Sequence, residues 1–230
     1  MIYENLSEAA AGDNAPVANG AKEMNVFSFV FLMGCQLAAG LNVVVPAYPV
    51  KAVRGGNVVA VIEFSKGAAS RVVILYADEP FAEPTRTALA QWRVPAERKD
   101  KPALVVVNFR DPFLSMVNTG RGIKLEPQSH RINSGQYDRS MPVPILVVDP
   151  LYSDASLVVM GASVLHLEVT ESGSVGGVEV IQALGDYTQA TVEAVKKWNF
   201  VPARNETDKS VASDAFAICV YRPLQNVREP

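Results

Sequence analysis

The sequence predicts an α+β protein built from two β-β-α-β units, each a small antiparallel sheet covered by one helix. The two tryptophans of the 230-residue chain lie in similar stretches, "ALAQWRVPAERK" (88–99) and "AVKKWNFVPARN" (194–205). A hairpin pattern precedes each tryptophan, and an apolar β-branched run follows it. Such internal similarity indicates a repeated supersecondary unit. The two units can stand apart or join into one pseudo-symmetric sheet.

Each predicted hairpin combines alternating side chains with a glycine-containing turn. Residues 57–78 place Val59 and Val61 opposite Ile62, and residues 163–184 place Leu165 and Leu167 opposite His166. Alternation with period two is typical of a strand that has two different faces. The turns are expected around Gly67 and Gly173, because glycine tolerates turn conformations.

A helix is expected after each hairpin, with its tryptophan near the end. Tyr187, Thr191 and Trp198 fall on one face at helical spacing. Because an indole is large and apolar, we expect each tryptophan to cover its sheet rather than to bind a ligand. Pro95 and Pro202 then end the helical stretches. Final strands are predicted at residues 103–112 and 215–223.

Composition excludes several function classes. The 21 basic and 24 acidic residues give a formal net charge of −3, which argues against a nucleic-acid-binding face. The chain has two histidines, and neither lies in a sequence pattern typical of a catalytic or metal site. We therefore expect no enzymatic activity, no catalytic residues, no cofactor and no metal. Cys35 and Cys219 are interpreted as buried thiols and do not identify the compartment.

The remaining segments divide the chain further. Residues 1–24 are interpreted as a mobile leader and residues 224–230 as a tail. Residues 25–45 are nearly continuously apolar and about as long as the ~20 residues that span a bilayer. They are a buried core element, a membrane anchor or a signal. Residues 113–144 are rich in Gly, Ser, Asn and Pro and form a linker or a functional excursion between the units.

The two units resemble the TonB C-terminal domain over residues 46–112 and 145–223. The resemblance rests on an aromatic-Pro pair, glycines in the hairpin, and a W-x-F-x-P-A element that is complete in "WNFVPA" (198–203). The residues that carry it are Tyr48, Pro49, Gly56, Gly67, Trp92, Pro95, Gly173, Trp198, Phe200 and Pro202. The first unit has one residue fewer between its tryptophan and proline, and the second has Tyr152-Ser153 in place of Tyr-Pro. The Pro/Lys-rich spacer of a full TonB protein is missing from the sequence, which favours a soluble or tethered relative over an energy transducer.

This resemblance implies a non-enzymatic protein-binding module of the bacterial envelope, placed in the periplasm, although the residues leave the cytoplasm open. Such domains bind short extended segments by adding a strand to a sheet edge, and they often dimerise in the same way. The expected partner is an envelope protein or a short extended peptide, and a homodimer is a further option. The candidate edge strands are the last ones of each unit, with Val105, Val107, Phe109, Phe216, Ile218 and Val220.

Three alternatives remain open at the level of sequence. The two candidate edge strands can pair with each other, which would leave neither of them free. A ligand-binding or hydrolytic protein would instead have a cleft between the units, roofed by residues 113–144. A purely structural dimerisation module is the third alternative.

Overall fold

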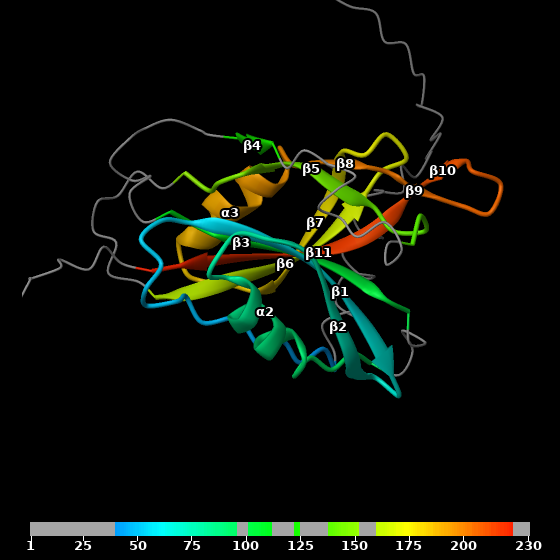
Figure 1. The fold of residues 1–230 in the computed structure, drawn as a ribbon. Helices are drawn as coiled ribbons and strands as arrows, with labels where there is room; N and C mark the ends of the chain where they lie inside the picture. The colour runs from blue at the N-terminus through cyan, green and yellow to red at the C-terminus, as the bar shows by residue number, and fades with distance from the viewer. Residues whose placement is uncertain (1–39, 96–100, 112–121, 125–137, 152–159, 223–230) are drawn as a thin grey trace, which may run out of the picture.

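The computed structural model describes residues 40–95, 101–111, 122–124, 138–151 and 160–222, which form a mostly β structure with two helices (Figure 1). The main element is a six-stranded sheet in the order β2-β1-β3-β11-β6-β7. Its strands are β1 (Gly56–Ser65), β2 (Ala68–Ala77), β3 (Ala103–Phe109), β6 (Gly161–Val169), β7 (Val175–Gln182) and β11 (Ser213–Tyr221). All neighbours are antiparallel except β3 and β11, which are parallel, so the sheet is mixed.

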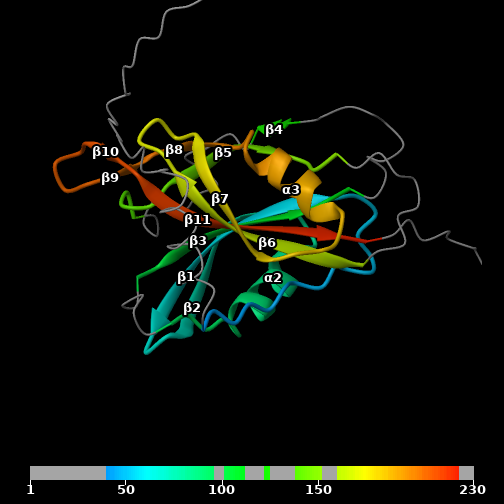
Figure 2. The same cartoon turned by 180° about the vertical axis from the view of Figure 1, so that it is seen from behind.

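Helices α2 (Ala82–Leu89) and α3 (Tyr187–Val195) lie on opposite faces of this sheet (Figures 1 and 2). A three-stranded sheet, β4-β5-β8, consists of β4 (Gly122–Lys124), β5 (Val143–Val148) and β8 (Asn199–Val201). The strands β9 (Ala203–Arg204) and β10 (Ser210–Val211) form a separate hairpin. None of the helices in the described ranges has the length and apolar character needed to cross a membrane.

The predicted alternation in the hairpins is confirmed, and it feeds two separate cores. In β1, Val58, Ala60 and Ile62 belong to the core under α2, whereas Val59 and Val61 belong to the core on the α3 side. In β6, the residues Leu165, Leu167 and Val169 belong to the core on the α3 side. Both faces of the sheet therefore carry buried apolar side chains along the central strands, and this burial provides much of the driving force for folding.

Each tryptophan closes one of these cores, as predicted. The side chains of Trp92 and Trp198 are 0% and 2% exposed, respectively. Trp92 packs edge-on against Phe216 with 5.3 Å between ring centroids. Each indole Nε1 also donates a hydrogen bond to a backbone carbonyl, that of Val44 for Trp92 and that of Val148 for Trp198. The polar edge of the ring is thus satisfied while its faces are buried.

The two halves of the chain repeat small details of backbone geometry. Gly67 and Gly173 both have positive φ, of 76° and 85°, and their carbonyls accept from the amides of Val94 and Phe200. Register shifts interrupt the β1–β2 pairing at two places, and the β6–β7 pairing is interrupted at the corresponding two places. Such bulges bend a strand locally and strengthen its twist.

The expectation that β3 and β11 are edge strands is wrong. They lie at the centre of the sheet and pair with each other in parallel, from Phe216 opposite Val105 to Val220 opposite Phe109. All six proposed edge residues are buried and belong to the core under α2; they are Val105, Val107, Phe109, Phe216, Ile218 and Val220. The physical reason is burial on both faces: every residue of β3 is buried, and strands covered on both sides favour the middle of a sheet. The alternative in which these strands pair with each other is the one observed.

Several predicted segments lie wholly or partly outside the described residues. They are the leader 1–24, most of the apolar segment 25–45, much of the linker 113–144, and the tail 224–230. Of the apolar segment, residues 40–45 are described, and Asn42 forms an antiparallel bridge with Arg93. Cys35 and His130 also fall outside, whereas Cys219 is a buried free thiol whose pKa burial raises.

Candidate interaction edges

The outer edges of the six-stranded sheet are β2 and β7, one from each half of the chain. An edge strand exposes unpaired backbone amides and carbonyls along one side, so it is the place where a further strand can add. The two edges occupy corresponding positions in their hairpins, but their surroundings differ.

The β2 edge is partly covered by the helix beside it. Helix α2 packs along β2 and β1, and Arg86 of α2 donates from Nη1 to the carbonyl of Val72 at 3.1 Å. The only charged residue of β2 itself is Arg71, which pairs with Glu63 on β1 at 3.2 Å. A shallow hollow of about 240 Å³ lies further along the strand, lined by residues 74–77. These contacts protect the first half of β2 against a new strand.

The β7 edge is more open. Helix α3 packs on β6 and β5, and none of the eight residues of β7 is fully buried. Yet the strand is rich in β-branched apolar residues, and Val180 is 44% exposed. Gly176 and Gly177 have no side chains of their own, and the side chains of Thr170 and Glu168 lie over them. An edge strand of this composition is either protected or used for binding.

Acidic side chains gather beside β7, on the face of the sheet that carries α2. His166 on β6 lies opposite Glu179 on β7, and its Nε2 is 3.3 Å from Asp214 Oδ2 on β11. Glu168 extends over Gly177, since a Cβ there would lie 2.4 Å from Glu168 Oε2. The pKa of Glu179 is raised, chiefly by burial and also by the nearby Glu168 carboxylate, although His166 acts in the opposite direction. The strands β6, β7 and β11 contain no lysine or arginine, so the charged side chains that they contribute here are the carboxylates around His166.

A buried polar cluster lies where the central strands end. Asn108 on β3 donates from Nδ2 to Asn57 Oδ1 at 2.9 Å and also to Asp149 Oδ1. Arg110, only 2% exposed, donates from Nε to the carbonyl of Pro150 at 2.8 Å. Burial raises the pKa of Asp149 from 3.8 to about 6, although the Asn108 hydrogen bond and the Arg110 charge act in the opposite direction. The cluster ties the chain after β5 to the end of β3.

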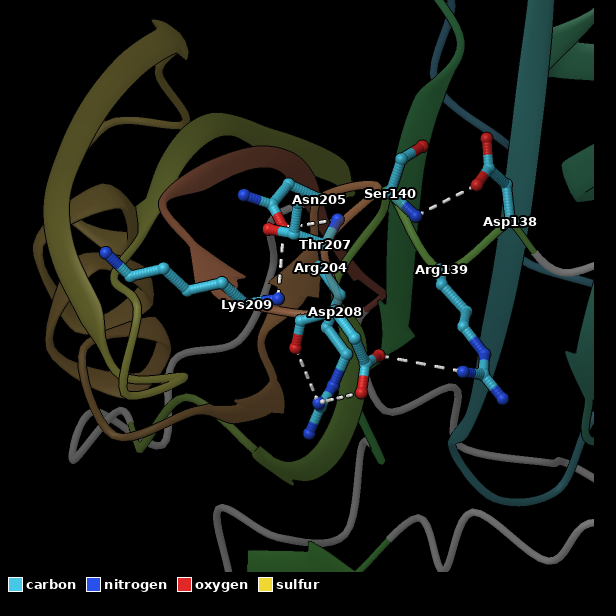
Figure 3. Close-up of polar contacts among 8 residues, drawn as sticks. All are labelled: Asp138, Arg139, Ser140, Arg204, Asn205, Thr207, Asp208 and Lys209. Carbon is cyan, nitrogen blue, oxygen red and sulfur yellow. Dashed lines mark hydrogen bonds and ion pairs between the residues drawn. The ribbon is translucent and has the colours of Figure 1, made fainter.

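The β9–β10 hairpin has a tip that is ordered by its own side chains (Figure 3). Asn205 Oδ1 accepts from the amides of Thr207 and Lys209, at 3.1 and 3.0 Å. Asp208 has a positive φ of 61° and lies between Arg204, at 3.0 Å, and Arg139, at 3.6 Å (Figure 3). These pairs are exposed, and such ion pairs contribute about 1 kcal/mol or less. The hairpin tip is therefore held in shape by its own side chains, and its exposed ion pairs add little to stability.

The signature residues at the start of the first unit hold a loop against the end of the sheet. The Tyr48 hydroxyl donates to the carbonyls of Arg54 and Arg110, and burial raises its pKa. Its ring packs edge-on against Phe81, which also leaves no room for a Cβ at Gly56. Three further signature residues follow the tryptophans in the chain. Phe200 lies in β8, Pro202 separates β8 from β9, and Pro95 follows Val94. Pro49 accepts a hydrogen bond from Arg222 through its carbonyl.

A cleft between the two halves is not a feature of the described residues. The halves meet along the β3–β11 pairing, where the side chains are buried, so core packing fills the junction. His166 does lie beside carboxylates, as a catalytic alternative would require, but it does so on the sheet surface. The hollow at residues 74–77 lies at the opposite edge of the sheet.

Comparison with known proteins finds a family match in the second half of the chain. Residues 157–218 match the family model for the Gram-negative bacterial TonB protein C-terminal. This match covers roughly a quarter of the chain and includes β6, β7, α3, β8, β9, β10 and most of β11. No curated protein matches the chain. Residues 157–218 are therefore similar to the TonB C-terminal domain, and the match does not extend into the first half of the chain.

Sequence reasoning missed both outer edges, although signals for them exist. The runs "ALVVVNF" and "AFAICV" are apolar without alternation, which is typical of strands buried on both faces. By contrast, "VGGVEVIQ" contains two glycines and a glutamate, and β2 contains "SR". Polar residues and glycines are more common on edge strands than on central ones.

Proposed function

We propose that this protein is a non-enzymatic protein-binding module of the bacterial envelope that binds extended segments by β-strand addition. The single observation that supports this most is the match of residues 157–218 to the TonB C-terminal family, whose domain mediates protein interactions in the envelope. Within that region, β7 is a solvent-accessible sheet edge. Strand addition needs such an edge, because the backbone hydrogen bonds provide affinity.

The proposal includes a tandem origin for the fold. Three features support it: a hairpin followed by a helix occurs in both halves, each half has a buried tryptophan with a hydrogen-bonded indole, and the bulges fall at corresponding positions. In this view two TonB C-terminal-like units lie side by side, with their last strands paired in one sheet. The outer edges of the pair then serve for binding, in place of the last strands.

Site-specific photo-crosslinking in a Gram-negative host tests this function. A photoreactive amino acid is placed at Val180 on β7, at Ile74 on β2, and, as a control, at the exposed Glu193 on α3. We expect crosslinks to a discrete envelope protein from an edge position and none from the helix. Equal labelling from all three positions, or labelling of cytoplasmic proteins alone, would contradict the proposal.

A further inference from the structure

We propose that the β7 edge, rather than β2, is the binding edge, and that its partner is an extended protein segment in which apolar residues alternate with lysine or arginine. This inference rests on the proposed function and specifies which edge it uses and the chemistry of its partner. It is carried by the accessibility of β7 and by the different character of the two faces beside that strand.

Accessibility distinguishes the two edges. On β2, the guanidinium of Arg86 already occupies the outward region at Val72, whereas the corresponding helix α3 contributes no arginine and packs on β6 and β5. The described residues include no side chain that donates a hydrogen bond to a β7 carbonyl. Val180 is 44% exposed, and no residue of β7 is fully buried.

The two faces beside β7 define the side chains of an added strand. On the α3 face, Val178 and Val180 lie opposite Leu167 and Leu165 and continue the apolar core outward. On the α2 face, Glu179 lies opposite His166, with Glu168 and Asp214 nearby. Because neighbouring strands align their side chains face by face, a partner strand would place apolar residues beside the valines and cationic residues beside Glu179.

Charge also argues against a second copy as the occupant. If β7 paired with β7 of another molecule, two clusters containing Glu179, Glu168 and Asp214 would come close together. Like charges on adjacent strands are destabilising, and opposite charges are stabilising. The acidic face therefore favours a basic segment over self-association, and it disfavours an acidic one.

Fluorescence anisotropy with the full chain and short labelled peptides tests the inference. One peptide alternates valine and lysine over about nine residues, and a second replaces every lysine by glutamate. We expect the lysine peptide to bind and the glutamate peptide not to bind, with affinity falling as salt is raised. Glu179→Lys should weaken binding of the lysine peptide at least about tenfold, because it replaces attraction with repulsion.

Two matched edge variants separate this inference from the proposed function. Val180→Lys on β7 should abolish peptide binding, whereas Ile74→Lys at the corresponding place on β2 should leave it unchanged. Loss of binding with Ile74→Lys alone, or equal binding of both peptides, would overturn the inference and leave strand addition as the function. Peptide binding that neither variant alters would overturn both the inference and the proposed function.

A dimer in light scattering that Val180→Lys dissociates would identify a second copy as the occupant and overturn the inference. Circular dichroism confirms that each variant is folded.

Discussion

Trp92 and Trp198 make the same contact on opposite faces of one sheet. Each indole Nε1 donates at 2.9 Å to the carbonyl of a residue in the segment that precedes its hairpin, Val44 for Trp92 and Val148 for Trp198. Two threonines repeat the correspondence, since Thr85 and Thr191 each donate from Oγ1 to a carbonyl four residues earlier at 2.8 Å. The equivalence has consequences for stability that can be measured.

We expect Trp92→Ala and Trp198→Ala to destabilise the fold by similar amounts, about 3–5 kcal/mol each. Both remove a fully buried ring and leave a cavity, and both leave a backbone carbonyl without its donor. Urea unfolding followed by circular dichroism measures the loss. Gln189→Ala on the exposed face of α3 is the control and should change stability by less than about 0.5 kcal/mol. A near-neutral effect at either tryptophan would contradict its role in closing a core.

The hairpin glycines provide a second prediction. Gly67 and Gly173 have positive φ, and a Cβ would lie 2.7 Å from the Val94 carbonyl oxygen and 1.9 Å from that of Phe200. We expect Gly173→Ala to cost at least about 2 kcal/mol, and Gly67→Ala somewhat less, because left-handed strain adds to the clash.

Gly185 provides the matched control for this pair. Its φ is 50°, but a Cβ there would meet nothing within 4 Å. Gly185→Ala should therefore cost only the conformational strain, about 1 kcal/mol. Equal losses at all three positions in urea unfolding would show that the close contacts at the two hairpins do not matter.

Periodicity in the sequence predicts the local features of this fold. Alternation along residues 57–64 and 163–169 predicted the hairpins and their faces, because side-chain direction in a strand is a local property. Helical spacing from Tyr187 to Trp198 predicted the buried face of α3 for the same reason. The core position of both tryptophans followed from their size and apolar character.

The order of strands could not be predicted in the same way. Whether β3 pairs with β11 depends on contacts between residues more than 100 positions apart, and no local pattern encodes that pairing. The uniform burial of β3 was visible as an apolar run, yet a run of this length is compatible with any strand covered on both faces. The acidic group around His166 was also hidden, because its members come from three strands.

The central position of β11 predicts that proline cannot replace Ile218. Ile218 is fully buried and pairs with Val107 on one side and with Val164 on the other, so its strand is hydrogen-bonded on both sides. Proline removes an amide donor and is excluded from central strands. We expect Ile218→Pro to lose cooperative unfolding, whereas Ile218→Val should cost about 0.5–1.5 kcal/mol. A cooperatively folded proline variant would contradict the central placement.

The buried carboxyl of Asp149 predicts a pH dependence of stability. Burial raises its pKa in the folded protein to about 6, above the value of about 3.9 expected for an unfolded chain. Between about pH 4 and pH 6 the folded state therefore holds more protons than the unfolded state. Stability from this group is fully present below about pH 4 and is lost as the pH rises through about 6. At about 1.4 kcal/mol per pKa unit, the loss is on the order of 3 kcal/mol.

Asp149→Asn isolates this contribution from that of other carboxyls, such as Glu179. Asparagine does not ionise, and its side-chain oxygen can still accept the hydrogen bond from Asn108 Nδ2. In urea unfolding at intervals from pH 4 to pH 8, the difference in stability between variant and wild type should grow in favour of the variant as the pH rises to about 6, and then level off. A difference that stays constant over this range would mean that Asp149 titrates normally and that its surroundings do not penalise the charge.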